Sequence, residues 1–436
     1  MNPRLDWSSH PAGPLHGSVR VPGDKSISHR ALMLAAIAEG SSRIQGFLEG
    51  EDTRATAAVL AQLGVRIDAP SAGERVVHGV GLHGLRGPAR PLDCGNAGTG
   101  MRLLAGLLAG QGFDSTLVGD PSLSRRPMRR VTDPLAQMGA RIDAHQGMPP
   151  LRLHGGAALS GIQYQLPVAS AQVKSAILLA GLYASGTTEV IEPHPTRDYT
   201  ERMLAAFGWP VQFAPGRVRL DGGHRLRATN IEVPADFSSA AFFLVAASIV
   251  PGSELRLPAV GLNPRRIGLL HALRLMGADI VVERQREAGG EPVGDLRVRH
   301  APLHGIELPL DLVTDMIDEF PVLFVAAAAA SGRTVVRGAA ELRVKESDRI
   351  AAMATGLRTL GVSVEETPDG AIIEGGTMGA GSVESLTDHR IAMSFAVAGL
   401  VANGPVKISD CGHVATSFPG FHELANGCGF VLQDAG

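Results

Sequence analysis

The sequence contains, at residues 21–40, the segment VPGDKSISHRALMLAAIAEG. It opens with polar and charged side chains, continues as about three helical turns of small and aliphatic residues, and ends at a glycine. The same pattern returns at residues 93–112, 166–186, 233–252, 314–332 and 385–404. A polar start and a glycine stop predict a helix, and apolar residues on nearly every side predict that the helix is buried. A pattern repeated at a nearly constant spacing indicates an internal repeat.

The segments between these helices also follow one order. After the first helix come a strand at 42–47, a second helix at 52–63 and two strand-like runs at 65–67 and 75–77. The later units keep this order, and their second helices are expected to begin at residues 127, 196, 263, 346 and 419. Helices alternating with strands predict an α/β fold. The six units divide into two domains of three, with Pro234 near the midpoint of the chain.

Composition excludes several classes of protein. The formal net charge of −3 argues against a general nucleic-acid or anionic-membrane binder, because such proteins usually carry a basic excess. Cys94, Cys411 and Cys428 are odd in number and scattered, which indicates a reducing compartment rather than a disulfide framework. The first residues lack the apolar core of a signal peptide, and the longest apolar runs are shorter than the roughly 20 residues that span a bilayer. We therefore expect a cytoplasmic protein.

Cations recur at the predicted helix starts. A cation at a helix N-terminus opposes the macrodipole by roughly 0.3–1 kcal/mol, so its repetition suggests an anionic ligand. Solvated surface charges, or arginines paired with acids at neighbouring caps, are the alternative interpretation. Carboxylates suited to proton transfer accompany the cations: Asp318, Glu319, Glu346, Asp348 and Asp388. The cations are Arg54, Arg126, Arg197, Arg266 and Arg349 in the second helices, and Lys25, Arg30, Arg102, Lys174 and Arg390 in the first.

Several common cofactor motifs fail on inspection. Residues 79–84 match the glycine spacing of a dinucleotide site, but Pro88 and Pro91 follow where a helix should begin. Residues 23–26 lack the adjacent Gly-Lys pair and the earlier glycine of a phosphate-binding P-loop. The sequence contains no HExxH motif and no Gly-x-Ser-x-Gly nucleophile elbow. We therefore expect no metal and no other cofactor.

Five motifs in order carry a resemblance to a known family: GDKSISHR at 23–30, NAGTGMR at 96–102, RPM at 126–128, RVKESDR at 343–349 and DHR at 388–390. Together they resemble the 5-enolpyruvylshikimate-3-phosphate (EPSP) synthase family over nearly the whole chain. The resemblance implies an inverted α/β barrel of six βαβαββ repeats, three in each of two domains. One domain would comprise 1–21 and 235–436, and the other 22–234. The substrates would lie in the cleft between them, and closure of the domains on the substrates is expected.

The resemblance also implies an activity, namely transfer of the enolpyruvyl group of phosphoenolpyruvate to the 5-hydroxyl of shikimate 3-phosphate through a tetrahedral intermediate. The chain would act as a monomer on these small molecules, without nucleic acid or membrane. Asp318, helped by Lys345, would accept the hydroxyl proton, Glu346 would protonate carbon, and Lys25 would assist the leaving phosphate. Shikimate 3-phosphate would be held by Lys25, Ser26, Arg30, Ser170, Gln172, Arg197, Asp318 and Lys345. Phosphoenolpyruvate would be held by Lys25, Gly98, Arg126, Gln172, Arg349 and Arg390.

Three residues depart from the best-known members of the family. Ala171 stands where a second serine is common, Glu341 where an amide is frequent, and Thr416 where a lysine usually meets phosphoenolpyruvate. A rival of the same fold transfers enolpyruvate to UDP-N-acetylglucosamine and uses a loop cysteine, but Pro121 occupies that position here. A catalytically silent binder of phosphorylated metabolites would not require Asp318 and Glu346 together.

Overall fold

The computed structural model describes residues 5–435, and its chain divides into two units. Unit 1 comprises Met1–Pro22, Ala235–Arg286 and Pro292–Gly436. Unit 2 comprises Gly23–Pro234 together with Glu287–Glu291. The short segment 287–291 is thus grouped with the residues of unit 2, although the sequence around it belongs to unit 1.

Unit 2 contains three four-stranded sheets, with strand orders β14-β3-β5-β4, β6-β7-β9-β8 and β10-β11-β13-β12. In each sheet the first pair of strands is parallel and the other pairs are antiparallel. The elements follow in the order α1 (Lys25–Ala36), β3 (Glu39–Gln45), α2 (Glu51–Gln62), β4 (Arg66–Asp68), β5 (Glu74–Val80), β6 (Leu92–Asp93), α3 (Gly98–Ala109), β7 (Ser115–Val118), η1 (Leu123–Arg125), α4 (Arg129–Gln137), β8 (Arg141–His145), β9 (Met148–His154), β10 (Gln163–Gln165), α5 (Ala171–Gly181), β11 (Thr187–Ile191), α6 (Tyr199–Ala206), β12 (Val211–Ala214), β13 (Arg217–Asp221) and β14 (Ile231–Glu232).

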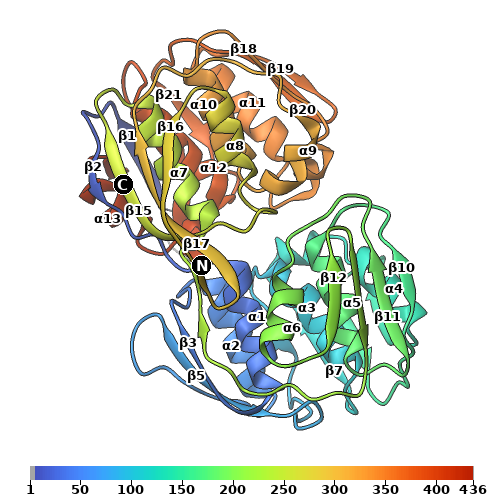
Figure 1. Ribbon diagram of the computed structural model, residues 1–436. Helices are drawn as coiled ribbons and strands as arrows, with labels where there is room; N and C mark the ends of the chain where they lie inside the picture. The colour runs from blue at the N-terminus through green and yellow to red at the C-terminus, as the bar shows by residue number, and fades with distance from the viewer. Residues whose placement is uncertain (1–4, 436) are drawn as a thin grey trace. The chain divides into compact units, whose positions relative to one another are not determined.

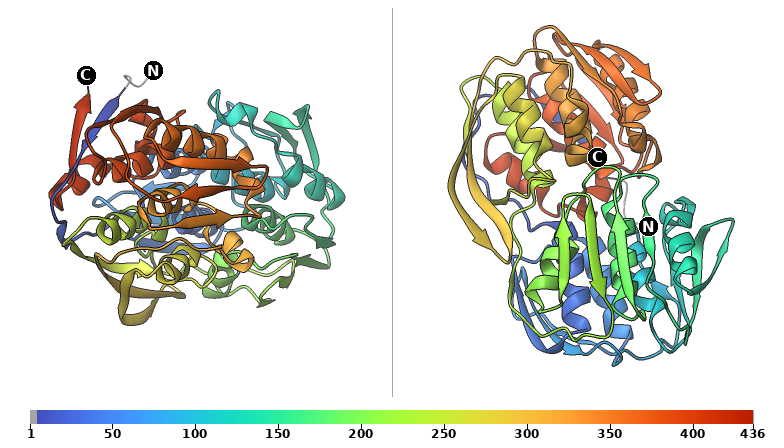
Figure 2. Two further views of the ribbon diagram at one scale, coloured as in Figure 1. Left: turned by 90° about the horizontal axis from the view of Figure 1, so that it is seen from above. Right: turned by 45° about the vertical axis from the view of Figure 1, so that its right-hand side comes forward.

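The helices α1, α3 and α5 form the centre of unit 2. Nearly all their residues are buried, as the apolar runs that follow their polar starts predict. Gly106 of α3 allows the closest approach, because a Cβ atom there would lie 2.1 Å from the carbonyl oxygen of Ala176 in α5. The views of Figures 1 and 2 show these helices with the sheets around them. Their N-terminal turns carry half of the residues that were expected to bind substrate, namely Lys25, Ser26, Arg30, Gly98, Ser170 and Gln172.

Unit 1 contains two four-stranded sheets, β21-β22-β1-β23 and β16-β17-β15-β2, and one three-stranded sheet, β18-β20-β19. The elements are β1 (Asp6–His10), β2 (His16–Ser18), α7 (Phe237–Ile249), β15 (Glu254–Gly261), α8 (Gly268–Leu275), β16 (Asp279–Ala288), β17 (Glu291–Arg299), α9 (Leu310–Val313), η2 (Thr314–Met316), α10 (Phe320–Ala329), β18 (Arg333–Val336), η3 (Ala340–Val344), α11 (Arg349–Thr359), β19 (Ser363–Thr367), β20 (Gly370–Glu374), β21 (Gly381–Glu384), α12 (His389–Gly399), β22 (Val406–Ser409), η4 (Cys411–Thr416), α13 (Phe421–Gly427) and β23 (Val431–Ala435).

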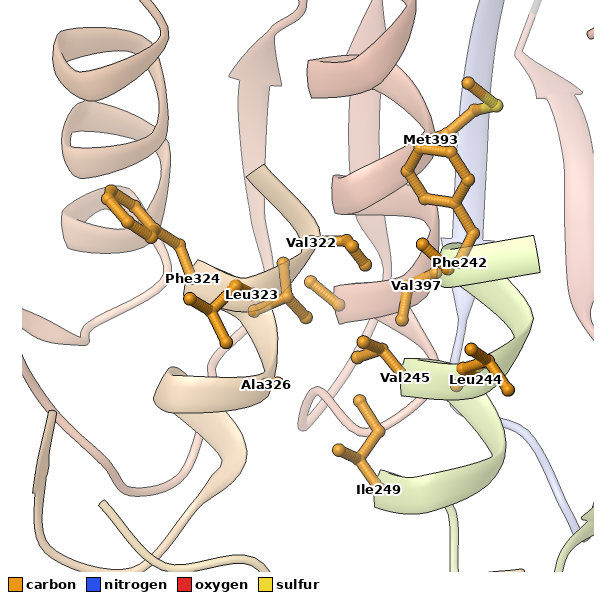
Figure 3. Packing of buried hydrophobic residues seen from close by; sticks show 14 of the residues in the cluster. Phe242, Leu244, Val245, Ile249, Val322, Leu323, Phe324, Ala326, Met393 and Val397 are labelled. Atoms are coloured by element: carbon orange, nitrogen blue, oxygen red, sulfur yellow. The ribbon is translucent and has the colours of Figure 1, made fainter. Parts of the chain in front are cut away.

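The core of unit 1 forms where α7, α10 and α12 pack together. Figure 3 shows Val245 of α7, Val322 and Leu323 of α10, and Val397 of α12 in the space where these helices meet. All 13 residues of α7 are buried, which explains why its sequence shows no polar face. Each fully buried Val, Leu or Phe side chain contributes about 1.5–3 kcal/mol by transfer from water, so this three-helix contact is a major source of stability.

The N-terminal strand β1 lies inside a sheet made otherwise from the last fifty or so residues of the chain. It pairs antiparallel with β22 on one side and with β23 on the other. Trp7 of β1 is buried and stacks on Phe421 of α13, with ring centroids 5.8 Å apart. The first and last described strands therefore lie side by side, as the left view of Figure 2 shows.

Several helix starts differ from the predicted ones. The second helix of the fourth unit was expected from residue 263 and begins at Gly268, and that of the fifth was expected from 346 and begins at Arg349. Asn263 instead folds a turn, since its side chain accepts a hydrogen bond from the Arg265 N–H at 2.9 Å. Asp348 is the true N-cap of α11 and accepts from the Ala351 N–H at 3.0 Å. Among residues 5–435 no helix combines the length and apolar character needed to cross a membrane.

Candidate active site

The first two turns of α1 hold three of the predicted binding residues, Lys25, Ser26 and Arg30. Asp24 caps the helix by accepting a hydrogen bond from the Ile27 N–H at 2.8 Å. Lys25 forms an ion pair with Asp52 at 2.9 Å, and Ser26 supplies its carbonyl to Arg30 at 2.9 Å. The Arg30 guanidinium is buried and also donates to two hydroxyls, those of Thr200 and Ser175, both at 2.8 Å.

Arg30 is therefore a buried cation whose hydrogen-bond acceptors are uncharged oxygens. Burial lowers its pKa to about 10, with the nearby charge of Arg197 acting in the same direction. Glu201 and Asp24 act in the opposite direction. A buried guanidinium with neutral acceptors is suited to bind an anion, because an anion would supply the charge compensation that these acceptors do not.

The N-termini of α3 and α5 are joined by Gln172. Its amide donates to the Thr99 hydroxyl at 2.8 Å, and its carbonyl oxygen accepts from Arg102 at 2.6 Å. Ser170 caps α5, and its hydroxyl accepts from the Val173 N–H at 3.4 Å. The predicted residues Ser170 and Gln172 thus lie together at the start of α5, and hydrogen bonds hold the polar atoms of both side chains in place.

Gly98 is the first residue of α3 and lies against a cation. A Cβ atom at Gly98 would stand 2.9 Å from Nη1 of Arg126 and 3.5 Å from Nη1 of Arg102. Arg126 in turn donates from Nη2 to the side-chain carbonyl of Asn96 at 2.7 Å. The absent side chain of Gly98 therefore lets two guanidinium groups approach the N–H groups at the start of this helix, an arrangement that favours anions.

In unit 1, Asp318 is the carboxylate at which three cations meet. Its Oδ2 lies 3.1 Å from Arg266, and its Oδ1 lies 3.7 Å from the Lys345 amine and 3.6 Å from Arg349. Asp318 and Lys345 are partly accessible, with 16% and 22% of their side chains exposed. Loss of surrounding water lowers the pKa of Lys345, and Arg349 adds to this, while Asp318, Glu341 and Glu346 act in the opposite direction.

A second group of charges in unit 1 centres on Arg349, which is buried at the start of α11. It pairs with Glu346 at 2.6 Å and with Asp388, the N-cap of α12, at 2.8 Å. Despite burial, these carboxylates and Asp318 raise the pKa of Arg349 above its ordinary value. Arg390, on the first turn of α12, lies 3.6 Å from Glu319. Each predicted cation of this unit therefore has a carboxylate beside it.

The structure also shows charged partners that the sequence analysis did not select. Asp52 pairs with Lys25, and Arg266 contacts Asp318, Glu319 at 3.4 Å and Asp236 at 3.6 Å. Arg266 had a signal in the sequence as one of the recurring helix-start arginines, and Glu319 had one as a carboxylate that accompanies them, whereas Asp52 and Asp236 had none. Arg54, another of these, is 62% exposed and pairs with Glu49 at 3.5 Å, so the alternative of a solvated surface charge holds there.

The three departures noted in the sequence lie at helix termini. Ala171 is the first residue of α5 and is buried. Glu341 lies in η3, and the Thr416 hydroxyl at the end of η4 donates to the carbonyl of His413 at 2.7 Å. The cysteines Cys94, Cys411 and Cys428 are all buried, and burial raises the pKa of Cys94 to about 12. These thiols are unsuited to act as nucleophiles.

Comparisons with known proteins agree with one another. The family profile described as EPSP synthase (3-phosphoshikimate 1-carboxyvinyltransferase) matches residues 10–424. The chain is 69% identical over 433 residues to the 3-phosphoshikimate 1-carboxyvinyltransferase of Xanthomonas campestris pv. campestris (strain B100), covering 99% of each. It is 70% identical over 431 residues to that of Xanthomonas euvesicatoria pv. vesicatoria (strain 85-10), covering 99% of this chain and 98% of the relative. A solved structure of EPSP synthase from Acinetobacter baumannii matches with a TM-score of 0.90 and 52% identity, over 99% of this chain and 100% of that one.

Proposed function

The chain belongs to the EPSP synthase family, and from this premise we propose how its residues divide the work of that family's reaction. It is a transferase with a mixed α/β fold that moves the enolpyruvyl group from phosphoenolpyruvate to shikimate 3-phosphate, a step of the shikimate pathway.

The fold proposal is an inverted α/β barrel of six βαβαββ repeats, three in each of two domains. The six sheets, and the burial of the first helix of each repeat, support it. The units 23–234 with 287–291, and the remainder, correspond to the two domains. Both would contribute residues to substrate binding. We further propose that the chain works as a cytoplasmic monomer on small molecules, without nucleic acid, as its slight negative charge favours.

Shikimate 3-phosphate is assigned to Lys25, Ser26, Arg30, Ser170, Gln172, Arg197, Asp318 and Lys345. The buried Arg30 supports the phosphate end of this assignment, because its three hydrogen-bond acceptors are neutral. A phosphate there would form charge-assisted hydrogen bonds, each worth roughly 1.5–3 kcal/mol. The hydroxyl end is assigned to Asp318 and Lys345, whose charged atoms lie 3.7 Å apart.

Phosphoenolpyruvate is assigned to Lys25, Gly98, Arg126, Gln172, Arg349 and Arg390. The open space at Gly98, bordered by Arg126, supports close approach of an anion to the start of α3. Arg349 and Arg390 each lie beside carboxylates. Substrate would therefore replace or share those partners. A planar guanidinium suits this exchange, since it can hold two oxygens at once.

The first chemical step is an addition across the enol double bond. The 5-hydroxyl oxygen of shikimate 3-phosphate bonds to the central carbon of phosphoenolpyruvate, and its proton passes to Asp318 with the help of Lys345. Glu346 gives a proton to the methylene carbon, which becomes a methyl group. The product of this step is a tetrahedral intermediate that still carries the phosphate. The single observation that carries the assignment is the meeting of Asp318, Lys345 and the Glu346–Arg349 pair in unit 1.

The second step is an elimination that restores the double bond. The bond between the central carbon and the phosphate oxygen breaks, and the phosphate leaves with both bonding electrons. Lys25 stabilises the departing charge and protonates the phosphate, and a methyl proton returns to Glu346. The proton that Asp318 took from the hydroxyl is returned to Lys25 through solvent, so the products are the enolpyruvyl ether and hydrogen phosphate. Preorganised cations around the phosphate lower the barrier because negative charge develops there during the step.

Phosphate release tests the proposal directly. Release should require both substrates together, with neither substrate alone producing turnover. Release from phosphoenolpyruvate alone would indicate simple hydrolysis and would contradict transfer to shikimate 3-phosphate. The same assay with UDP-N-acetylglucosamine as acceptor should give no release.

A further inference from the structure

Lys174, on the first turn of α5, is a buried lysine that the proposed reaction does not use. Its amine lies 3.0 Å from Glu192, 2.7 Å from Glu201 and 3.4 Å from the carbonyl oxygen of Thr196. The three side chains of this ion cluster are only 2–3% exposed. The ammonium group has three N–H donors, and these three acceptors use all of them.

Glu192 shapes the loop that leads to Arg197. Its carboxylate accepts hydrogen bonds from the backbone N–H of Thr196 at 3.3 Å and from the Thr196 hydroxyl. Because Lys174 holds the carbonyl of the same residue, the N–H, hydroxyl and carbonyl of Thr196 are all fixed by the cluster. Arg197 is the next residue in the chain, so its backbone begins from a fixed point.

Glu201 and Lys174 also stand next in sequence to the two hydroxyls that hold Arg30. Thr200 precedes Glu201 on α6, and Ser175 follows Lys174 on α5. These hydroxyls hydrogen bond to each other at 2.7 Å, and each accepts from Arg30 at 2.8 Å. The ion cluster and the two hydroxyls that accept from Arg30 therefore lie next to each other on the same two helices.

The positive charge of Lys174 determines how the ion cluster affects Arg30. Opposite charges attract more strongly inside a protein than in water, because little water screens them there. Without the amine of Lys174, the carboxylates of Glu192 and Glu201 would be buried with no ammonium beside them. The guanidinium of Arg30 would then be drawn toward them and would bind substrate phosphate less well.

We propose that Lys174 is a positioning residue for shikimate 3-phosphate: it neutralises Glu192 and Glu201, which keeps Arg30 for the phosphate, and it fixes the loop that carries Arg197. The inference rests on the proposed roles of Arg30 and Arg197. A buried ion cluster can instead serve stability alone, and breaking such a pair is typically strongly destabilising. The test must therefore separate binding from stability.

Two single variants have opposite expected effects on the Michaelis constant for shikimate 3-phosphate. Lys174→Met leaves two buried carboxylates uncompensated and should raise this constant about 10- to 100-fold, a loss of roughly 1.4–2.8 kcal/mol in binding. The turnover number and the constant for phosphoenolpyruvate, measured at saturating shikimate 3-phosphate, should change less than about threefold. Glu201→Gln removes negative charge near Arg30 and should leave the constant for shikimate 3-phosphate unchanged or lower it. A cluster that acts only through stability would lower the unfolding temperature of Lys174→Met and leave its constant for shikimate 3-phosphate at the parent value, which would overturn the proposal. Weaker binding in both variants would also overturn it, because charge near Arg30 would then not be the cause.

A triple variant keeps the test decisive if Lys174→Met does not fold. Lys174→Met combined with Glu192→Gln and Glu201→Gln has no uncompensated charge, so it should fold and bind shikimate 3-phosphate more tightly than Arg30→Met, a variant that lacks the guanidinium. Parent-like binding in Lys174→Met would overturn the proposal. A triple variant that folds but binds shikimate 3-phosphate as weakly as Arg30→Met would overturn it as well.

Arg197→Ala, measured in the same assay, separates this inference from the proposed function. If Arg197→Ala weakens shikimate 3-phosphate binding and Lys174→Met does not, only the role of Lys174 is wrong. If Arg197→Ala has no effect, the proposed binding residues themselves are wrong.

Discussion

Replacing Gly98 by alanine should separate the stability of the fold from the binding of phosphoenolpyruvate. The new Cβ atom would lie 2.9 Å from Nη1 of Arg126, closer than Cβ atoms are normally found to any neighbour. The other atoms nearby, Nη1 of Arg102 and Cδ1 of Leu123, would lie at 3.5 and 3.6 Å, which is ordinary contact. Arg126 is the group that must move, and the end of a long side chain can do so at little cost to the fold.

The size of the effect follows from what Arg126 gives up. A shift of about half an ångström would lengthen its 2.7 Å hydrogen bond to Asn96 and displace it from an anion at the start of α3. Charge-assisted hydrogen bonds contribute roughly 1.5–3 kcal/mol, so a partial loss of about 1–2 kcal/mol is expected. This corresponds to a rise of about 5- to 30-fold in the Michaelis constant for phosphoenolpyruvate. Stability should stay equal or rise, because alanine favours a helix over glycine by up to about 1 kcal/mol.

Gly100→Ala is the matched control on the same helix. There the Cβ atom would lie 2.8 Å from the hydroxyl of Thr56, a short and buried side chain that cannot swing away. Overpacking of this kind costs about 1–3 kcal/mol of stability. Steady-state phosphate release and thermal unfolding of both variants give the comparison. An unchanged Michaelis constant for phosphoenolpyruvate in Gly98→Ala would show that the start of α3 does not face the substrate.

Three further variants concern the proton transfers in unit 1. Asp318→Asn should lower turnover by about 10²–10⁴ while calorimetric binding of shikimate 3-phosphate changes far less, and near-normal turnover would remove Asp318 from the mechanism. Glu346→Gln should slow the incorporation of solvent hydrogen into the methylene group of phosphoenolpyruvate, so incorporation at the parent rate would exclude Glu346 as the carbon acid. Lys345→Met should raise the unfolding temperature at neutral pH while turnover falls, because the folded protein holds the pKa of Lys345 below its unfolded value. At pH values between the folded and the unfolded pKa of Lys345, the unfolded parent binds more protons than the folded parent, so the parent gains stability as pH rises. The difference in unfolding temperature between the variant and the parent should therefore narrow with rising pH. A parent that is more stable than Lys345→Met at neutral pH contradicts this prediction.

The buried helices were predictable because the signals that define them are local. In the segment at 21–40, a polar start, an apolar run and a closing glycine lie within one stretch of chain, and α1 forms there. Short strands were harder, since β6 and β14 have two residues each and cannot show an alternating pattern. The placement of β1 between β22 and β23 depends on pairing across nearly the whole chain, which no local pattern records.

The sequence predicted the cations of the candidate site better than it predicted the carboxylates that pair with them. Lys25 and Arg349 stand in motifs that resemble those of the family, so the sequence singles them out. The pairing of Lys25 with Asp52 joins residues on two helices, and that of Arg266 with Asp236 joins residues about thirty positions apart. Such contacts depend on how helices pack, and packing is a property of the folded chain rather than of any one segment.

The position of β1 has a consequence for how the protein is made on the ribosome. The backbone N–H of Asp410 donates to Asp6, a contact between residues 404 positions apart. The ribosome adds about 5–20 residues per second, so β1 must wait roughly 20–80 s until β22 and β23 have been synthesised. Residues 23–234 emerge complete during that interval and can fold while β1 remains outside. The sequence of β1, DWSSH, suits this delay because a single large apolar side chain among polar ones gives a nascent chain little reason to aggregate.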